Sequence, residues 1–429
     1  MAASSSSGRL VRLAEILTES RIPGSRGDTA SKLTVRLYGR GVVAKADAGG
    51  SEETRYFRRR AGQLIYSKLD CLNGAIGLIP PHLDGYESTA DLPSFDIAKS
   101  VDPDFFLAFL SRPSFYLRFK AVAIGSRKAN RVPADEFLAT KVELPSRSEQ
   151  CAIAAVLRAS RERVAAAEAL ISALTEAKRN VMRELLTLGA ARDPARLRPL
   201  RERWVVGRVA EGVEAAPEGW RLVPLTRVAR LESGHTPSRD RPDWWDGDIP
   251  WISLQDTERL QGLEIFDSAE TIGTEGLANS SARLLPKGTV VFQRTASVGQ
   301  CSIMGRPMAT SQHFANWVCG PEIEPRYLLQ VFRHMTREWE RLQAGSVLPD
   351  IYMPTFKKLQ ILLPPRSEQL RIADVGEAFD RRLEAERVHL SELRATRDAL
   401  AAELLSGRLR LPAAVIARHA GADPGARAA

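Results

Sequence analysis

The sequence predicts a mixed α/β fold: two globular domains separated by two long helices, which pair as an antiparallel coiled coil with pseudo-two-fold symmetry. Three observations lead to this expectation. Residues 137–188 recur 219 positions later, counted from Leu144 to Leu363. Apolar residues follow a seven-residue spacing in both copies. Short apolar runs and one short helical pattern precede each copy in the same order, so the globular parts are also distant repeats.

The repeat is clearest in a seven-residue motif. Residues 144–150 read Leu-Pro-Ser-Arg-Ser-Glu-Gln, and residues 363–369 read Leu-Pro-Pro-Arg-Ser-Glu-Gln. Without a gap, Phe137 then matches Phe356. A period this long indicates two large modules and excludes a solenoid of short repeats.

The repeat and the composition divide the chain into six segments. They are a first globular domain (1–144), a central long helix (145–190), an arginine- and proline-rich exposed linker (191–216), a second globular domain (217–363), a C-terminal long helix (364–411) and a flexible tail (412–429).

The first globular domain opens with a mixed pattern. Residues 63–67 and 74–79 resemble short strands, and residues 102–110 predict a helix with Pro103 in its first turn. The same order returns at 288–293 and 323–332. All seven tryptophans fall between 204 and 339, so the two copies must present different surfaces.

The two long helices are predicted from a coiled-coil pattern. No proline or glycine occurs from 148 to 188, and a capping box at Ser146 and Glu149 favours a helix start there. A cation, Lys178 or Arg397, interrupts the seam at the same place in both copies, and a long stem lets it reach solvent. The seam comprises Ile153, Leu157, Val164, Ile171, Leu174, Val181, Leu185, Ile372, Phe379, Leu383, Leu390, Leu393, Leu400 and Leu404.

Composition narrows the function classes. The net charge of +9 and the pI near 9.5 suit a polyanion partner, although a GC-rich coding bias explains arginine-rich composition equally well. No apolar run is long enough to span a bilayer, and the first residues lack the apolar stretch of a signal peptide, so we expect a cytoplasmic protein without membrane contact. The four cysteines form no C-x-x-C pair, which favours reduced thiols.

Motifs for catalysis are missing from the sequence. There is no Asn/Asp-Pro-Pro-Tyr/Phe element for adenine methylation and no Walker phosphate loop, and the six scattered histidines form no H-E-x-x-H. Asp104, Glu176 and Lys178 match the residue types of a nuclease pattern. We do not expect a nuclease site, because Glu176 and Lys178 fall inside a predicted long helix. We therefore expect no catalytic residue, no metal site and no cofactor.

With these features together, the chain resembles the specificity subunit of type I restriction-modification systems. The doubled Leu-Pro-x-Arg-Ser-Glu-Gln motif with its long helix is similar to the repeat regions of that family. Residues 217–220, 233–238 and 247–252 resemble the opening of its target-recognition domains, and residues 286–291 through 309–312 resemble their later half. The first domain departs from this pattern, because it lacks the Gly-Trp and Gly-x-Thr-Pro opening.

The resemblance implies a noncatalytic subunit that supplies a DNA address. Each recognition domain would read one half of a split site in double-stranded DNA, and the paired helices would set the unread gap. The helices would also dock two methyltransferase (modification) subunits, which restriction/translocase subunits join for adenine methylation or cleavage.

Direct readout requires side chains that hydrogen-bond base edges, together with cations on phosphates. The adjacent Trp244 and Trp245 are expected to be partly core, with a DNA platform as the alternative. The candidate DNA-binding residues are Lys68, Arg127, Lys128 and Arg131 in the first domain and Arg239, Arg241, Gln293, Arg294, Gln312 and His313 in the second.

Two other functions stay open from the residues alone. One is the recognition portion of a fused methyltransferase-nuclease, which the missing Asn/Asp-Pro-Pro-Tyr/Phe element disfavours. The other is a coiled-coil scaffold with no DNA role.

Overall fold

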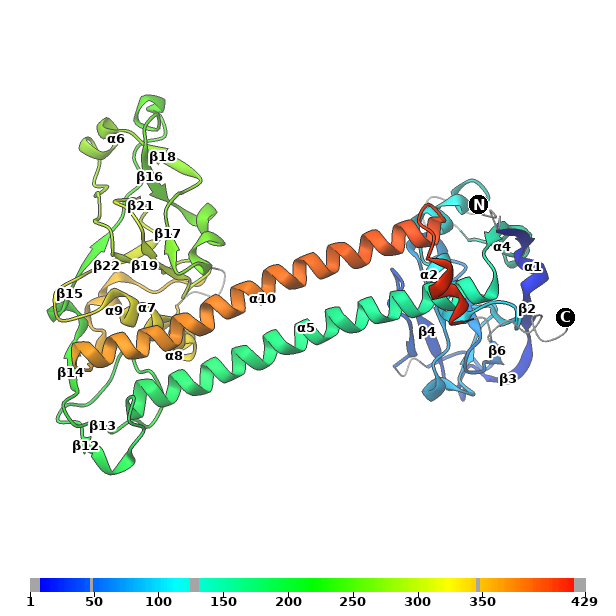
Figure 1. Ribbon diagram of the computed structural model, residues 1–429, viewed down its shortest axis with the longest axis horizontal. Coiled ribbons are helices and arrows are strands. Elements are labelled where there is room, and N and C mark those ends of the chain that lie inside the picture. The colour runs from blue at the N-terminus through cyan, green and yellow to red at the C-terminus, as the bar shows by residue number, and fades with distance from the viewer. Residues whose placement is uncertain (1–7, 47–48, 124–130, 345–347, 420–429) are drawn as a thin grey trace. The chain divides into compact units, whose positions relative to one another are not determined.

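The computed structural model describes residues 8–46, 49–123, 131–344 and 348–419, which fall into two compact units. Unit 1 comprises Met1–Ala166 and Ser391–Ala429, and unit 2 comprises Ala167–Leu390. Each unit holds one β-rich body, part of helix α5 (Arg147–Leu188) and part of helix α10 (Arg366–Ser406) (Figure 1). The expected mixed α/β class is confirmed.

Helices α5 and α10 are antiparallel neighbours, as predicted. They contain 42 and 41 residues, which makes each about 60 Å long at 1.5 Å per residue. All fourteen proposed seam residues are buried or half-buried. Both helices are followed by a glycine in the left-handed region, Gly189 (φ +73°) and Gly407 (φ +75°), a conformation that only glycine adopts easily.

The cation at the α5 seam does not reach solvent, so that prediction is wrong. The Lys178 side chain is only 16% exposed, and its Nζ lies 2.5 Å from Oδ1 of Asp380 on α10. The acidic partner is the reason, because it compensates the charge where it is buried. The cation at the α10 seam behaves differently: Arg397 is about one-third exposed and pairs with its neighbour Asp398.

The unit 1 body is built from small antiparallel sheets. Its central sheet has the order β2-β10-β7-β8 and is accompanied by β3-β6-β9, β4-β5 and β1-β11. The strands are β1 (Arg9–Arg12), β2 (Leu17–Ser20), β3 (Ile22–Arg26), β4 (Leu33–Val35), β5 (Val42–Ala44), β6 (Arg55–Arg58), β7 (Leu64–Tyr66), β8 (Ile76–Leu78), β9 (Glu87–Ser88), β10 (Ser94–Ile97) and β11 (Lys141–Leu144); the α-helices beside α5 are α1 (Leu13–Ile16), α2 (Pro103–Leu110), α3 (Pro113–Tyr116), α4 (Ala134–Ala139) and the short α11 (Ala413–Ala417), which lies within the segment expected to be a tail.

A buried arginine joins the sheets of unit 1. Arg59 is 1% exposed, and its guanidinium donates to Ser88 Oγ at 2.7 Å, to the Ser20 carbonyl at 2.8 Å and to Ser94 Oγ at 2.9 Å. These acceptors lie on β9, β2 and β10. Burial lowers the pKa of Arg59 to about 10, and the negative charge of Glu19 offsets this effect only in part.

The unit 2 body has a larger sheet with the order β15-β22-β19-β20-β17 and a smaller one with the order β18-β16-β21. The aromatic core between the large sheet and α7 includes Phe292, Trp317, Phe332 and Trp339. The strands are β12 (Leu197–Pro199), β13 (Ala215–Pro217), β14 (Arg221–Pro224), β15 (Ala229–Ser233), β16 (Ile249–Ile252), β17 (Glu264–Ile265), β18 (Glu270–Ile272), β19 (Val290–Gln293), β20 (Cys301–Met304), β21 (Ala309–Thr310), β22 (Phe314–Cys319) and β23 (Gln360–Leu363); the shorter helices are α6 (Thr274–Ala278), α7 (Pro325–His334), α8 (Thr336–Leu342) and α9 (Met353–Lys357).

The segment between α5 and the second body is not the exposed linker that its composition predicts. Strands β12 and β13 pair with each other, and the side chains of Trp204 and Val209 are 6% and 7% exposed within the unit 2 core. The arginines and prolines of this segment indicated solvent exposure, but its few apolar residues dock it on the body. Burial of large apolar side chains outweighs composition here.

Candidate nucleic-acid interface

The repeated motif joins each long helix to its own body. Gln150 Oε1 accepts the backbone N–H of Asp102 at 2.9 Å, and Gln369 Oε1 accepts that of Glu324 at 2.8 Å. Asp102 and Glu324 are the N-cap residues of α2 and α7. The amide of each glutamine also donates to the carbonyl of its own motif proline, so both ends of the side chain are satisfied.

The arginine of each motif pairs with the same N-cap residue. Arg147 Nη1 lies 2.7 Å from Asp102 Oδ2, and Arg366 Nη2 lies 2.6 Å from Glu324 Oε2. Burial alone would raise the pKa of Asp102, but the N–H of Phe105 and the Arg147 guanidinium lower it below its ordinary value. A charged carboxylate at this helix N-terminus also suits the helix dipole.

The glutamate of each motif binds the segment that follows the other long helix. Glu149 accepts from Nη1 of Arg410, which follows α10, with both carboxylate oxygens, at 2.9 and 3.0 Å. Glu368 accepts the N–H of Ala190, which follows α5, at 2.8 Å, and the indole N–H of Trp220 at 2.9 Å. The predicted capping box is thus only half formed: the N–H of Glu149 reaches Ser146 Oγ at 3.3 Å, while the Glu149 carboxylate turns to Arg410.

Two of the candidate DNA-binding residues of the first domain lie next to each other. The backbone of Lys68 bonds to Asp91 and to Val132, and Arg131 Nη2 reaches Asp91 Oδ2 at 3.3 Å. The side chain of Arg131 is 54% exposed, and Lys68 is half-buried. Arg127 and Lys128 lie outside the described residues.

A set of exposed cations in unit 1 was missed by the sequence interpretation. Strands β3 and β6 with the β4–β5 hairpin expose a group of cations, and within the described ranges no acidic side chain pairs with them. Backbone bonds from Tyr38 and Gly39 to residues 73 and 74 fix the hairpin tip. The tip could have been found from the Tyr-Gly-Arg-Gly turn signal between two apolar runs. The cations are Arg26, Arg36, Arg40, Lys45, Arg55 and Arg58.

In unit 2, the two proposed arginines are each neutralised by a carboxylate. Arg239 makes a bidentate pair with Glu270 at 2.6 and 3.0 Å and lies 3.5 Å from the centroid of the Trp245 ring. Arg241 makes a bidentate pair with Asp243 at 2.8 and 3.0 Å. Bonding to Glu270 raises the pKa of Arg239, and bonding to Asp243 raises that of Arg241. Both side chains are more than half exposed, so the arginines can exchange a carboxylate for a phosphate.

Two other candidates are structural residues, which corrects the sequence interpretation. Gln293 is fully buried; its Oε1 accepts from Thr257 and its Nε2 donates to the Thr295 carbonyl. Arg294 is 15% exposed, and its Nη1 donates to both carboxylate oxygens of Asp350, at 2.8 and 3.0 Å. Neither side chain can reach a base edge in this arrangement.

The remaining candidates, Gln312 and His313, lie in the turn between strands β21 and β22 of unit 2. Gln312 is exposed, and its Oε1 accepts from Thr236 Oγ1 at 2.5 Å; its amide nitrogen donates to no other described residue. Neighbouring His313 is half-buried, and burial, reinforced by the Arg294 charge, lowers its pKa. Trp245 is half-buried and packs edge-on against Trp251 at 4.9 Å, while Trp244 is also half-buried.

The described residues contain no group of three or more His, Cys, Asp or Glu side chains that could hold a metal ion. Searching the same residues for a helix long and apolar enough to cross a bilayer returned none. The thiols are unpaired, and burial raises the pKa of Cys71 to about 12 and that of Cys301 to about 11. Such buried thiols are poor nucleophiles.

The sequence is similar to that of known proteins. Residues 217–394 match the family described as the type I restriction modification DNA specificity domain. The chain is 28% identical over 180 residues to the type I restriction enzyme MjaIX specificity subunit of Methanocaldococcus jannaschii, and 22% identical over 200 residues to the HindI specificity subunit of Haemophilus influenzae. These alignments cover 42% and 45% of this chain and 42% of each relative.

Solved structures match over nearly the whole chain. The HsdS subunit from Thermoanaerobacter tengcongensis aligns with a TM-score of 0.50 and 18% identity, covering 94% of this chain and 98% of that one. A chain from a study of complex assembly in the type I R-M system aligns with a TM-score of 0.55 and 19% identity, covering 95% and 100%. These likenesses establish the fold, with two long antiparallel helices and β-rich bodies.

Proposed function

The chain belongs to the specificity subunits of type I restriction-modification systems, and from this membership we propose that it is the noncatalytic component that addresses such a complex to DNA. Each β-rich body reads one half of a bipartite double-stranded site. The paired helices set the unread gap and dock two methyltransferase subunits, which restriction/translocase subunits join in the cytoplasm.

One observation carries the proposal: the same helix junction is made twice on two unlike bodies. Gln150 and Gln369 bind equivalent N-cap residues, whereas all seven tryptophans belong to the second body. A duplicated support with diverged heads suits a protein that must recognise two different half-sites. A scaffold without a DNA role would not need the heads to differ.

The charges support a nucleic-acid partner. The net charge is +9, and unit 1 exposes six cations that have no acidic partner among the described side chains. Such cations bind phosphates and release counterions, while exposed amides such as that of Gln312 suit base edges. In the second body, Arg239 and Arg241 would leave their carboxylates when phosphates approach.

The helices support a fixed gap. Their length of about 60 Å corresponds to roughly 18 base pairs at 3.4 Å each. A continuous helix is stiff on this scale, so the number of helical residues would determine the spacing of the half-sites.

The test is a map of modified adenines in the source genome, with and without this gene. We expect a two-part motif with a constant gap that disappears when the gene is deleted and returns with a plasmid copy. Unchanged modification after deletion would refute the proposal. Purified chain that methylates DNA without partners would instead support a fused methyltransferase.

A further inference from the structure

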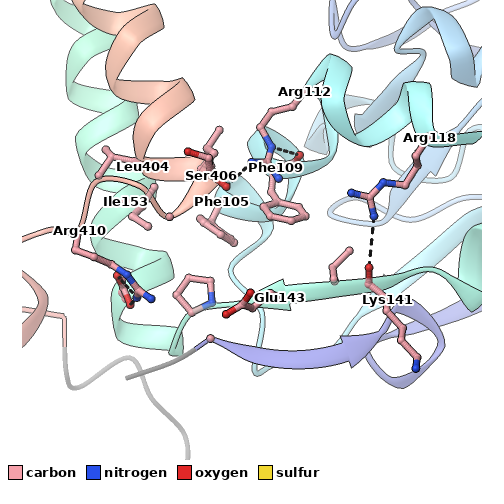
Figure 2. Close-up of a pocket in the computed structure, with 16 residues that line it drawn as sticks. Phe105, Phe109, Arg112, Arg118, Lys141, Glu143, Ile153, Leu404, Ser406 and Arg410 are labelled. Carbon is pink, nitrogen blue, oxygen red and sulfur yellow. Dashed lines mark hydrogen bonds and ion pairs between the residues drawn. The ribbon is translucent and has the colours of Figure 1, made fainter. Parts of the chain in front are cut away.

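A cavity of about 350 Å³ lies in unit 1, where the C-terminal end of α10 meets the edge of strand β11 (Figure 2). Its walls combine apolar side chains, including Phe105, Phe109 and Leu404, with the guanidinium groups of Arg112 and Arg118. Figure 2 shows both arginines above the β11 backbone at Lys141 and Glu143.

The internal repeat identifies the equivalent place in unit 2. The N–H of Leu13 donates to the Thr140 carbonyl, just as that of Leu225 donates to the Leu359 carbonyl, so β1–β11 and β14–β23 share one register. In that register, Gly8, which precedes β1, is equivalent to Trp220, which precedes β14. The Trp220 ring is 9% exposed and donates to Glu368, whereas Gly8 contributes no side chain to the cavity.

The equivalent place in unit 2 is filled by an extended segment of this chain, residues 203–208. The Gln360 N–H donates to the Val206 carbonyl at 2.9 Å, and its side chain accepts the N–H of Val205 at 3.0 Å. Glu338 accepts the N–H of Gly207 at 2.9 Å. The segment is therefore bonded to the outer edge of β23 at Gln360, through one backbone bond and one side-chain bond, and Trp204 anchors it in the core.

The β11 edge has the same outward geometry. Lys141 occupies the position in β11 that Gln360 occupies in β23. In an antiparallel pair, every second residue directs its N–H and C=O groups away from the partner strand, and Lys141, like Gln360, is such a residue. Of these groups, the Lys141 carbonyl accepts from Arg118 at 3.4 Å. A strand edge that no other described strand pairs with, beside a cavity lined by both polar and apolar side chains, is a geometry that binds extended peptides.

The cavity has a net positive lining, because the cations Arg112, Arg118, Lys141 and Arg410 outnumber the carboxylates Glu143 and Glu149. Arg112 donates to the carbonyls of Phe109 and Leu405, and Arg118 donates to that of Lys141, but neither guanidinium has a carboxylate partner among the described residues. Burial, then the nearby Arg118 charge, lowers the pKa of Arg112 to about 10. An anion brought into this cavity would relieve that repulsion.

We propose that this groove binds an extended peptide segment of a partner protein, one that carries an aromatic side chain and carboxylates. The peptide adds to the outer edge of β11, its aromatic ring takes the place that Trp204 of the segment 203–208 takes in unit 2, and its carboxylates pair with Arg112 and Arg118. The site is separate from the DNA-reading role, because it uses neither the exposed cations of β3 and β6 nor the loops of unit 2.

The test uses a peptide that copies residues 203–208, with both terminal arginines replaced by glutamates: fluorescein-labelled Glu-Trp-Val-Val-Gly-Glu. Fluorescence anisotropy with the full chain should show saturable binding below about 1 mM. The parent sequence Arg-Trp-Val-Val-Gly-Arg should bind at least tenfold more weakly, because its charge opposes that of the groove. Equal binding of the two peptides would overturn the role of the arginines.

Two variants test the location without removing the α10 contacts of Arg112. Arg118→Gln removes an exposed cation. Gly8→Trp fills the cavity; a new Cβ would lie 2.7 Å from Cγ of Glu143, whose side chain must rotate, and 3.2 Å from the Leu144 carbonyl oxygen. Each should weaken the acidic peptide at least tenfold, whereas the exposed Arg21→Gln should leave it unchanged. Circular dichroism melting curves establish that each variant is folded.

Three outcomes would overturn the proposal. They are no saturable binding to the wild-type chain, unchanged binding to folded Arg118→Gln and Gly8→Trp, and binding that appears only after residues 420–429 are deleted. The last outcome would assign the groove to this chain's own tail and not to a partner.

Discussion

The Nζ of Lys178 on α5 lies 2.5 Å from Oδ1 of Asp380 on α10, with both side chains about 15% exposed. The other carboxylate oxygen of Asp380 accepts from Gln330 at 2.8 Å and lies 3.2 Å from Arg333, both on α7. Arg333 in turn donates to the Gly262 carbonyl beside strand β17. One carboxylate therefore connects both long helices to the second body, and the equivalent positions of the repeat, Arg161 and Arg397, carry like charges instead.

Removing Asp380 should destabilise unit 2 strongly. Burial alone would raise the pKa of Asp380, but Lys178 and Arg333 lower it, so the carboxylate stays charged. Asp380→Leu would leave both cations buried without compensation, at a cost of about 3–5 kcal/mol in the free energy of unfolding. Lys178→Met with Asp380→Leu should recover part of that loss. Urea unfolding followed by tryptophan fluorescence reports on unit 2 alone, and strictly additive losses would contradict the coupling.

His334 should make unit 2 sensitive to acid. Burial, reinforced by Lys178, Arg183 and Arg179, lowers its pKa from 6.5 to about 4. Between these values the unfolded chain binds the proton more readily, so this contribution to stability is complete above about pH 6.5 and is lost as the pH falls toward 4.

Between pH 6.5 and 4, protonation linked to His334 should lower the free energy of unfolding by about 3 kcal/mol. His334→Gln cannot titrate, so its stability relative to wild type should rise by that amount between pH 6.5 and 4. The exposed His235→Gln serves as the control and should follow wild type. Parallel pH profiles for all three proteins, measured by tryptophan fluorescence, would show that His334 does not carry the effect.

We expect substitutions of the motif glutamines, Gln150 and Gln369, to destabilise separate bodies. Gln369→Leu removes the acceptor for the Glu324 N–H and leaves the Pro364 and Glu322 carbonyls without their donor, which should lower the stability of unit 2 by about 2–3 kcal/mol. Gln150→Leu makes the same change in unit 1, which has no tryptophan. Tryptophan fluorescence should therefore move to lower urea only for Gln369→Leu. A shift of equal size for Gln150→Leu would mean that the two bodies unfold together.

The long helices could be predicted from sequence because a heptad pattern is local. The partner of Lys178 could not, because Asp380 is adjacent to a seam residue and becomes its neighbour only when the register of the pair is known. The docking of residues 191–216 depends on a few apolar side chains, such as Trp204, that composition hides.

Gln293 and Gln312 show how far the DNA-binding residues could be predicted from the sequence. Gln293 ends the run Val290-Val291-Phe292 in the middle of the five-stranded sheet, where all four residues are buried. A continuous apolar run is the sign of a strand covered on both faces, and that sign could have excluded Gln293. Gln312 sits in an irregular turn, whose exposure no periodicity indicates.

The same two glutamines should separate recognition from stability in the proposed DNA-reading role. Gln312→Ala should relax modification at one base of a single half-site by about 1–3 kcal/mol, because its free amide suits a base edge. Gln293→Leu should lower the stability of unit 2 and leave base preference unchanged. Methylation of a target library with single-base changes measures both, and relaxed preference in Gln293→Leu alone would reverse the assignment.

The helix pair should fix the gap between half-sites through its length. Deleting residues 159–165 from α5 and 393–399 from α10 removes one heptad from each of two stretches that antiparallel pairing places opposite one another. The seam keeps its phase, and the Lys178–Asp380 pair is retained. Each helix becomes about 10 Å shorter, which corresponds to roughly three base pairs and about 100° of rotation along the duplex.

The adenine modification map should then show the original half-sites with a gap shorter by three base pairs. A deletion in α5 alone, which breaks the match between the helices, should abolish modification. If the matched deletion still modified sites with the original gap, the helices would not determine the spacing.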